Sequence, residues 1–591
     1  MDITRRSVLG AGAAVGAGLL LPLHLTERAI AGVPAGLTPF TEALPTLTEL
    51  GVIDATGGGS TTIEMVNANH HFHSALPATP TYAYRGGNVA QDYLGPVIVA
   101  QQGVPFSVTM VNNLGAHPLA SAIDYDLDGV VAADATAPRV SAHLHGGNTE
   151  PGNDGDPTDT FVPDDGPRTY YYGNTQEAAG LWYHDHAVGI TRLNVLAGLA
   201  GGYLIRNADD PGDGTLRADG SGLPPAPDYE VPLIIQDRMF NVDGTFAYPP
   251  NVNPGTAGRP WAPEFFGDVA TVNGKAWPNL NVAQGKYRFR LYNGSNARVY
   301  NLRLRSAAPA SIFFQIGSDG GLLNAPVPLT SLLLAPGERA DIVIDFAKLR
   351  PGATVVLGND ARAPFPDGPR AIRQGGMPLP TIMQFTVTAT AGWTAPLPAR
   401  LRATPIMPLT TVDRPVTAIR SMTLVENLNA LGSPLMALIN NREFEAAGAT
   451  TTVLSNALEQ WDLINTTVDA HPIHLHFTQF QVLNRQKFDS AGYFAAAYGT
   501  QPLEHGTGSF PPPSVAPFLR GGTQAPSANE QGWKDTVLAL PGEVTRIIVP
   551  FGANAGGSVT AFQASHFGSY VWHCHILEHE DNDMMQRFAI V

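Results

Sequence analysis

Cysteine is nearly absent from this sequence, which holds a single one, Cys574, among 591 residues. One cysteine cannot form a disulfide within the chain, so its thiol is either free for chemistry or simply buried. Charge is scarce as well: charged residues make up 15% of the chain, and 51 acidic against 35 basic residues give a formal net charge of −16. Nucleic acids and acidic membranes repel a protein of this sign, so we expect neither as a partner.

Long helical periodicity is also missing, whereas glycine (62) and proline (50) are abundant and 44% of the residues are hydrophobic. Short segments rich in Val, Ile, Thr and Tyr alternate with turn residues, as at residues 96–99 and 106–111. This pattern predicts an all-β protein built of β-sandwich or barrel units. The chain is too long for one core, and proline-rich linkers divide it into predicted domains at residues 32–210, 228–392 and 412–591.

The first thirty-one residues are predicted to be a targeting segment. Arg5 and Arg6 precede an apolar run at residues 8–21, and a small-residue site follows at Ala29-Ile30-Ala31. This order resembles a twin-arginine export signal, and the apolar run is too short to span a bilayer comfortably. We therefore expect a protein exported to the periplasm or the extracellular space, without stable membrane insertion. An N-terminal helix of the mature fold is the alternative, but neither caps nor an amphipathic period support it.

The stretch around the single cysteine carries the main chemical signal. It reads His573-Cys574-His575, with His579 four residues further and Met584 five beyond that. One thiolate, two imidazoles and a weak axial thioether form the ligand set of a blue-copper site. Side chains alternate along a strand, so Cys574 must face away from its two neighbours. The stretch then supplies one of the two histidines, and the other must come from elsewhere.

Three further clusters repeat the H-x-H spacing, which places two imidazoles on one face of a strand. They are His143 with His145, His184 with His186, and His471 followed by His474 and His476. A single pair is more often a surface or hydrogen-bonded strand histidine. Ten of the seventeen histidines, however, fall in these clusters and the terminal stretch, so metal binding is the better explanation. The group His70, His71 and His73 has no partner cluster and is predicted to be structural.

These motifs resemble the four copper-binding signatures of the multicopper oxidases, in the family's order: H-L-H-G, W-Y-H-D-H, H-P-I-H-L-H and H-C-H-x₃-H-x₄-M. The greatest similarity is to the group of bacterial spore-coat laccases, bilirubin oxidases and phenoxazinone synthase. It extends through residues 181–202, 235–238, 272–275, 315–323 and 532–536 and thus covers all three predicted domains.

The resemblance implies three cupredoxin-like Greek-key domains and four copper ions: one type 1, one type 2 and two type 3. The type 1 copper would lie in the third domain, the other three between the first and third, and the second domain would be a spacer and cleft wall. Carried over by position, the ligands would be His471, Cys574, His579 and Met584 for type 1, His143 and His474 for type 2, and His145, His184, His186, His476, His573 and His575 for type 3.

The resemblance further implies a laccase-like enzyme. It would take single electrons from phenols, aromatic amines or bilirubin-like pigments and reduce dioxygen to water. Glu580 and Asp154 would supply protons, with solvated surface carboxylates as the alternative, and Asp185 would orient the copper cluster. One rival is a metallo-oxidase of Cu(I) or Mn(II), against which the lack of a methionine-rich insertion counts. Another is a copper-free cupredoxin scaffold, which filled ligand positions oppose. The long segment 488–532 is either a wall of the substrate cleft or a mobile surface insertion.

Overall fold

Strands dominate the computed structural model of this protein, with 41% of residues in strands and 9% in helices. The structure describes residue 34 and residues 36–306, 313–370, 376–411, 415–445, 448–508, 510–552 and 566–591, so the predicted signal lies outside the described residues. The prediction of an all-β fold is confirmed. Among the described residues, no helix combines the length and the apolar character needed to cross a bilayer.

The first group of strands, called the first unit, forms a five-stranded sheet in the order β1-β4-β9-β8-β6 and a four-stranded sheet in the order β3-β2-β5-β7. Apolar residues of both sheets, such as Ile98 and Val108, enter one buried cluster, so the two sheets enclose a core. The elements are α1 (Leu47–Leu50), β1 (Val52–Ala55), β2 (Gly59–His70), β3 (Thr79–Arg85), β4 (Val97–Gln101), β5 (Phe106–Asn113), β6 (Ala142–His145), β7 (Arg168–Tyr172), β8 (Gly180–Asp185), α2 (Thr191–Ala197) and β9 (Ala200–Arg206).

The second unit has a seven-stranded sheet in the order β12-β11-β10-β14-β19-β16-β17 and a five-stranded sheet in the order β13-β21-β20-β15-β18. Its strands are β10 (Glu230–Arg238), β11 (Val269–Val272), β12 (Lys275–Ala276), β13 (Asn279–Gln284), β14 (Lys286–Asn293), β15 (Tyr300–Ser306), β16 (Phe313–Ser318), β17 (Gly321–Leu329), β18 (Leu332–Leu334), β19 (Arg339–Asp345), β20 (Thr354–Asn359) and β21 (Thr381–Ala391).

The third unit has two five-stranded sheets, in the orders β23-β22-β25-β29-β27 and β24-β31-β30-β26-β28. Its elements are β22 (Ala418–Leu428), β23 (Pro434–Ile439), β24 (Thr451–Val453), β25 (Ala457–Asn465), β26 (His471–Leu475), β27 (Gln481–Lys487), α3 (Ser490–Tyr498), β28 (Thr536–Ala539), β29 (Glu543–Phe551), β30 (Gly568–Cys574), α4 (Leu577–Glu580) and β31 (Met585–Ile590). The three groups of strands fall within the ranges predicted as domains. The domain boundaries themselves stay a prediction.

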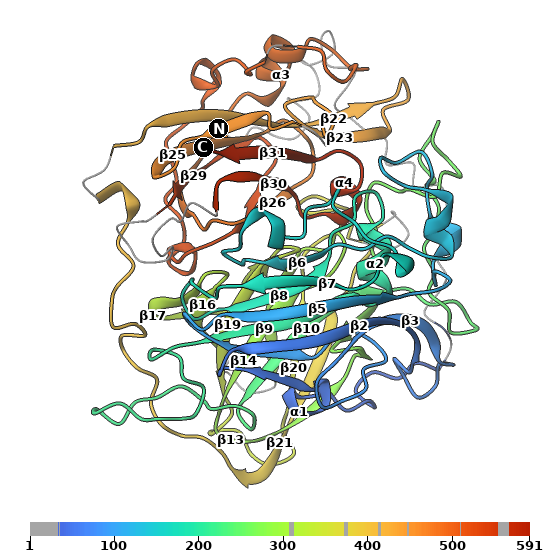
Figure 1. Ribbon diagram of the computed structural model, residues 1–591. Helices are drawn as coiled ribbons and strands as arrows, with labels where there is room; N and C mark the ends of the chain where they lie inside the picture. Colours follow the sequence, from blue (N-terminus) through green and yellow to red (C-terminus); the bar gives the residue numbers. More distant parts are fainter. Residues whose placement is uncertain are drawn as a thin grey trace, which may run out of the picture.

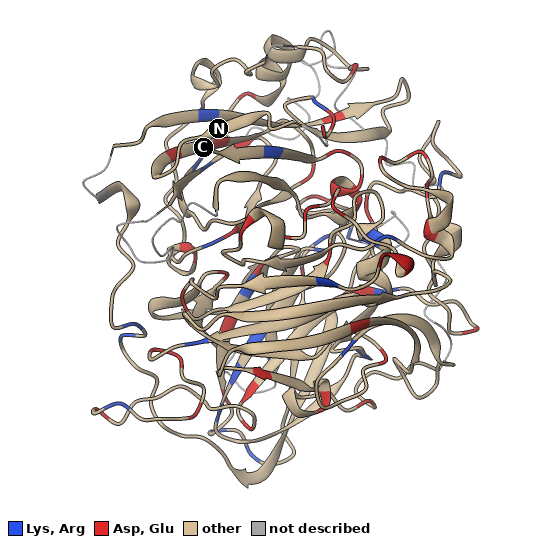
Figure 2. Ribbon diagram, in the orientation of Figure 1, with Lys and Arg blue, Asp and Glu red and all other residues tan. Residues whose placement is uncertain are grey.

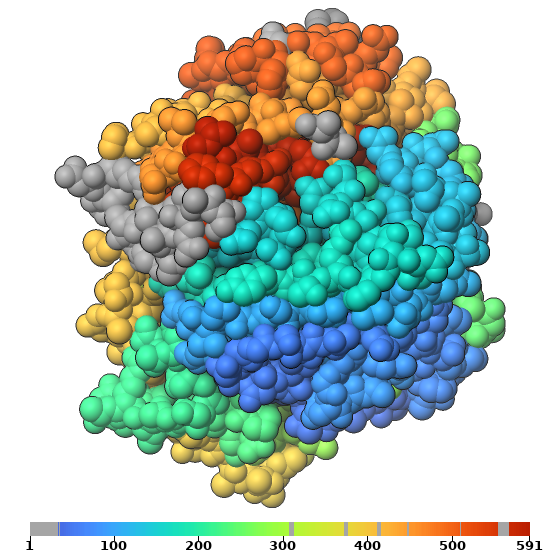
Figure 3. Space-filling view, in the orientation of Figure 1, coloured from blue at the N-terminus to red at the C-terminus, as the bar shows by residue number. Residues whose placement is uncertain are grey.

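The first and third units pack against each other along their histidine-bearing strands. β6 and β8 lie beneath β26 and β30 in Figure 1, and the red C-terminal segment abuts the cyan chain in Figure 3. Strand register places His143 opposite His184 in the first unit and His474 opposite His573 in the third. All four residues of β6 and all six of β8 are buried. Strands that would be half exposed in an isolated sandwich are therefore covered here by another unit.

The segment 488–532 packs onto the third unit. Phe488, Tyr493 and Tyr498 join a small apolar cluster with Val425 of β22 and Val544 of β29. Other residues of the segment, among them Leu503 and Val515, belong to the same cluster, so part of the segment makes apolar contacts with one sheet of the third unit. Whether it forms a wall of the substrate cleft stays a hypothesis.

Candidate metal centres

Eight buried histidines meet where the first and third units touch, and we call them the histidine cluster. Each is at most 1% exposed. Rings from the two units stack in pairs, with centroids 3.8 Å apart for His143 and His476 and 3.6 Å apart for His145 and His474. The members are His143, His145, His184, His186, His474, His476, His573 and His575, so the structure brings together every residue predicted to hold the type 2 and type 3 coppers.

Backbone carbonyl groups orient four of these rings by accepting from Nδ1. The acceptors are Asp154 O for His143 (2.5 Å), Asp185 O for His184 (2.8 Å), Asp535 O for His474 (2.9 Å) and Cys574 O for His573 (3.2 Å). An imidazole that donates through Nδ1 keeps its lone pair on Nε2. The second nitrogen of each ring is thus left as a potential ligand atom.

Several ring nitrogens of the histidine cluster have no hydrogen-bond partner in the protein. Nε2 of His143, His184 and His474 is buried without a hydrogen bond, and so are both ring nitrogens of His575. Buried polar atoms are normally satisfied, so a concentration of ring nitrogens without hydrogen bonds is what a cation-binding site would present. Burial, reinforced by neighbouring imidazoles, lowers the pKa of His143 and His184 well below the usual value, so these rings are neutral and able to coordinate. The cluster therefore fits the metal ions that the sequence predicts.

A second group, which we call the thiol site, lies inside the third unit. Cys574 Sγ is 3.6 Å from His471 Nδ1 and 3.7 Å from His579 Nδ1, and all three side chains are buried. β26 supplies His471, β30 supplies Cys574 and α4 supplies His579. Burial raises the pKa of the Cys574 thiol well above the usual value, whereas a coordinating metal ion would deprotonate it outright. The missing second histidine of the terminal stretch is thus provided by His471, as predicted for the type 1 ligands.

Met584 and Met585 have different surroundings. Met584 is fully buried, and its carbonyl oxygen accepts from Cys574 N at 2.9 Å. Met585 packs instead with Val188, Phe444 and Val571. Met585 also pairs with His573 across β30 and β31, and the assignment of Met584 to the thiol site stays a prediction.

Asp154 joins the two units across the histidine cluster. Besides its carbonyl bond to His143, its Oδ2 lies 2.7 Å from His476 Nδ1, and its Oδ1 accepts from Thr149 Oγ1 at 2.7 Å. Burial raises the pKa of Asp154 to about 8. Asp154 is therefore a buried group able to hold a proton beside two histidines, and the alternative of a solvated surface carboxylate does not apply to its position.

Glu580 and Asp185 occupy different positions relative to the cluster. Glu580 Oε2 lies 3.1 Å from His573 Nδ1, its Oε1 lies 3.5 Å from His186 Nδ1, and burial raises its pKa to about 7. The Asp185 carboxylate instead accepts from Ser141 N, Ala187 N and Asn194 Nδ2. Only the carbonyl oxygen of Asp185 reaches a cluster histidine, so any orienting effect of this residue acts through its backbone.

Thr467, Asp535 and Thr536 contact the histidines of the two sites but were not predicted from the sequence to do so; Thr536 Oγ1 lies 3.2 Å from His145 Nε2 and from His474 Nδ1. Thr467 Oγ1 lies 2.7 Å from His471 Nε2, on the side of the ring opposite Cys574. Asp535 Oδ1 lies 3.1 Å from His145 Nε2, and this carboxylate is bound by Arg339 of the second unit. Residues 532–536 carried similarity to the family, but no spacing or residue type in the sequence connects Asp535 with Arg339.

The three-histidine group near the N-terminus has ordinary partners. His70 lies 2.8 Å from Asp92 Oδ1 through Nδ1 and 2.7 Å from Gly274 O through Nε2. His73 Nδ1 accepts from Ala75 N, and its Nε2 lies 3.0 Å from Thr38 O. Both nitrogens of each ring are thus engaged within the protein, which supports a structural role.

Comparison with known proteins gives consistent matches along the chain. Two family models described as multicopper oxidase match residues 133–210 and 413–591. A laccase of Bacillus subtilis is 37% identical, and the match covers 88% of this chain and 93% of that relative. Multicopper oxidase LPR1 of Arabidopsis thaliana is 34% identical, and the match covers 94% of this chain and 93% of that relative. Among solved structures, McoA multicopper oxidase from Aquifex aeolicus superposes with a TM-score of 0.68 at 25% identity, covering 94% of this chain and 100% of that one.

Proposed function

Because this chain belongs to the multicopper oxidase family, we propose that it is a laccase-type oxidase of phenols and aromatic amines, possessing four copper ions. Family membership itself makes the protein a copper-dependent oxidoreductase that uses dioxygen and a reductant. The observation that carries the proposal is the presence of two separate ligand groups: a buried thiol between two imidazoles, and eight histidines with inward-facing nitrogens.

We assign the copper ligands in two groups. The thiol site would hold the type 1 copper through His471, Cys574, His579 and Met584. The histidine cluster would hold the type 2 copper through His143 and His474, and the two type 3 coppers through the other six histidines. Neutral imidazoles and a thiolate are ligands that suit copper.

The copper ions, when bound, supply the one-electron couple that accepts electrons from the donor and the four-electron reduction of dioxygen to water. The chain connects the two sites through Cys574, because the preceding and following residues, His573 and His575, both belong to the histidine cluster. Strand alternation turns the sulfur to one side and the two rings to the other. Three consecutive residues thus form a short covalent path between the sites.

Asp154 and Glu580 are proposed to deliver the protons that dioxygen reduction consumes. Each is buried, each lies within 3.1 Å of a cluster histidine, and burial raises the pKa of each toward neutrality. A buried carboxyl group with such a pKa can hold a proton and release it near neutral pH. Asp185 is proposed to orient His184 through its carbonyl oxygen.

The proposal is tested by loading the protein with copper and recording its visible spectrum, followed by oxygen uptake with a panel of phenols, bilirubin, Cu(I) and Mn(II). We expect an intense blue thiolate band and rapid oxygen uptake with phenols. Absence of the blue band would disprove the type 1 assignment. Oxygen uptake with metal ions alone would replace the laccase proposal by the second candidate.

The second candidate is a metallo-oxidase, and a pair of half-buried carboxyl groups favours it. Asp469 lies two residues before His471, and burial, together with the negative charge of Asp469, raises the pKa of Glu426 to about 8. We propose these two carboxyl groups as the ones that would bind the metal substrate, because their charges interact and oxygen ligands suit Mn(II) better than Cu(I). A Glu426→Gln variant that loses Mn(II) oxidation but keeps phenol oxidation would support this candidate.

Two further statements remain proposals. Residues 1–31 would act as a twin-arginine signal that exports the protein to the periplasm or beyond. A copper-free scaffold is disfavoured, because the predicted ligand residues are present in the sequence and lie together in the structure. Secretion of an active fusion, and its loss in an Arg5→Lys, Arg6→Lys double variant, would test the export proposal.

A further inference from the structure

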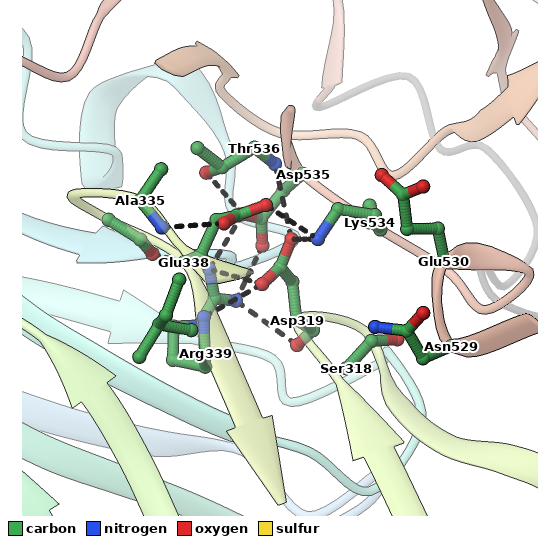
Figure 4. A network of polar contacts seen from close by, with 12 residues as sticks. Ser318, Asp319, Ala335, Glu338, Arg339, Asn529, Glu530, Lys534, Asp535 and Thr536 are labelled. Atoms are coloured by element: carbon green, nitrogen blue, oxygen red, sulfur yellow. Dashed lines mark hydrogen bonds and ion pairs between the residues drawn. The ribbon is translucent and has the colours of Figure 1, made fainter. Parts of the chain in front are cut away.

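The second unit lacks the H-x-H motifs, yet one of its residues reaches the histidine cluster. Arg339, at the start of β19, is 3% exposed and binds all three units. Its Nε donates to Gly180 O of the first unit at 3.1 Å, and its Nη2 donates to Asp319 O of the second at 3.1 Å. Both Nη atoms bind the Asp535 carboxylate of the third unit, at 2.6 and 2.5 Å (Figure 4).

Asp535 in turn contacts one histidine from each side of the cluster. Its carbonyl oxygen accepts from His474 Nδ1 at 2.9 Å, and its Oδ1 lies 3.1 Å from His145 Nε2. A carboxylate clamped by a guanidinium remains ionised and can only accept hydrogen bonds. His145 must therefore carry its proton on Nε2, which leaves Nδ1 as the nitrogen with a free lone pair. This nitrogen is buried and has no other partner.

Asp154 and Asp535 hold the cluster in the same manner from opposite units. Each binds a histidine of its own unit through its carbonyl oxygen and a histidine of the other unit through its carboxylate. The two differ in the remaining partner. Asp154 accepts from the neutral hydroxyl of Thr149, and Asp535 likewise accepts from the Thr536 hydroxyl, but only Asp535 is also bound by a cation, that of Arg339. Asp535 is thus held by an ion pair with Arg339, a residue of the second unit.

The packing around this clamp leaves little freedom. Lys534 Nζ lies 2.9 Å from Asp319 Oδ2 and 3.0 Å from Glu338 Oε1, so a second cation bridges the same two units (Figure 4). A side chain at Gly146, directly after His145, would approach Arg339 Nη2 to 2.6 Å and Asp535 Oδ2 to 2.8 Å. Because Gly146 has a φ of +84° and no side chain, the guanidinium can lie against the turn that follows His145.

We propose that Arg339 is a positioning residue of the histidine cluster, which fixes the orientation and tautomer of His145 and the position of His474 by clamping Asp535. The second unit is then part of the oxygen-reducing site, in addition to any role as a spacer. The inference rests on the copper ligands proposed above, since it concerns the geometry those ligands present.

The test compares copper-loaded wild type with Arg339→Lys and Asp535→Asn. For each protein we would measure copper per chain, the blue absorption, the electron paramagnetic resonance signal of the non-blue copper, and kcat and KM for a phenol. We expect an unchanged blue band and an unchanged KM, an altered or lost non-blue signal, and a kcat lower by about 10–100-fold, as for other partners of metal ligands. Asp535→Asn removes the charge with little change of size and provides the test even where Arg339→Lys does not fold.

Arg298→Lys is the matched control. Arg298 is a fully buried arginine of the second unit that binds Asp237 at 2.7 Å and the carbonyl groups of Met377 and Gly267. Its replacement should lower stability without changing the non-blue signal. The inference is overturned if both test variants keep the wild-type signal and kcat, or if Arg298→Lys changes them equally. A wild type without any non-blue copper would instead refute the proposed ligands.

Discussion

The thiol site and the histidine cluster are built in different ways. The thiol site takes His471, Cys574 and His579 from one unit, where two strands of one sheet and a short helix position them. The histidine cluster takes half of its members from each of two units and exists only when these units are docked. The thiol site therefore depends on the fold of one unit, and the histidine cluster on the interface between two.

Buried polar contacts hold that interface beside the two sites. Acidic residues gather around α4 (Figure 2), and among them Asp581 accepts from the backbone amides of Thr191 and Arg192 in the first unit, at 3.0 and 2.9 Å. The Arg192 guanidinium lies 3.3 Å from the same carboxylate. The α4 segment is thus one of the places where the third unit is held on the first.

The largest effect is expected from Cys574→Ser, which removes the sulfur but leaves the histidine cluster intact. We expect complete loss of the blue band and of donor-driven oxygen uptake, because the serine hydroxyl does not provide a thiolate ligand. The non-blue copper signal should persist, which copper analysis and paramagnetic resonance would measure. Loss of all copper would show that the two sites are not separable.

Arg192→Met tests the interface. Removal of one partner from a buried ion pair leaves an uncompensated charge, so we expect the free energy of unfolding to fall by about 3–5 kcal/mol. In denaturant titrations the histidine cluster should lose copper before the thiol site does. Arg520→Met, in a pair with Asp489 whose side chains are 55% and 43% exposed, is the control and should cost at most about 1 kcal/mol. Simultaneous loss of both signals in Arg192→Met would contradict the comparison.

Gly337→Ala tests the approach of the second unit to the cluster. Gly337 has a φ of +81°, and a methyl group there would lie 2.6 Å from His575 Cδ2. We expect an altered non-blue signal, a reduced kcat and an unchanged blue band. Gly352 has the same φ of +81° but no atom within 4 Å of an added methyl group, so Gly352→Ala carries only the backbone strain of about 1–3 kcal/mol. Equal spectra for both variants would argue against a contact with His575.

Thr467→Val should have the smallest effect. It removes the 2.7 Å contact to His471 Nε2, at a cost of about 0.5–1.5 kcal/mol, and leaves the interface untouched. A small shift in the reduction potential of the blue copper is expected, measured by redox titration, with the histidine cluster unchanged. Thr466→Val, which loses a bond to the Leu424 carbonyl, is the neighbouring control and should leave the potential at its wild-type value.

Much of the site was predictable from local pattern. The H-x-H spacing places two rings on one strand face, and the alternation around Cys574 separates the sulfur from its neighbours, because both follow from the two-residue period of a strand. The group at His70 and His73 was predicted to be structural because no further histidine cluster was left to complete a metal site, and the hydrogen bonds of both rings within the protein support that prediction. Composition and turn residues predicted strands throughout, and this is confirmed.

Residue types and the strand faces on which they lie follow from the sequence alone: a thiol with flanking imidazoles, and pairs of imidazoles on strands. The tertiary structure alone decided which faces meet. Contacts such as Asp154 with His476, and Arg339 with Asp535, join residues separated by 322 and 196 positions. No local period relates residues so far apart, because their proximity follows from the packing of whole units, and the partners that fix each histidine therefore emerge only when the units are assembled.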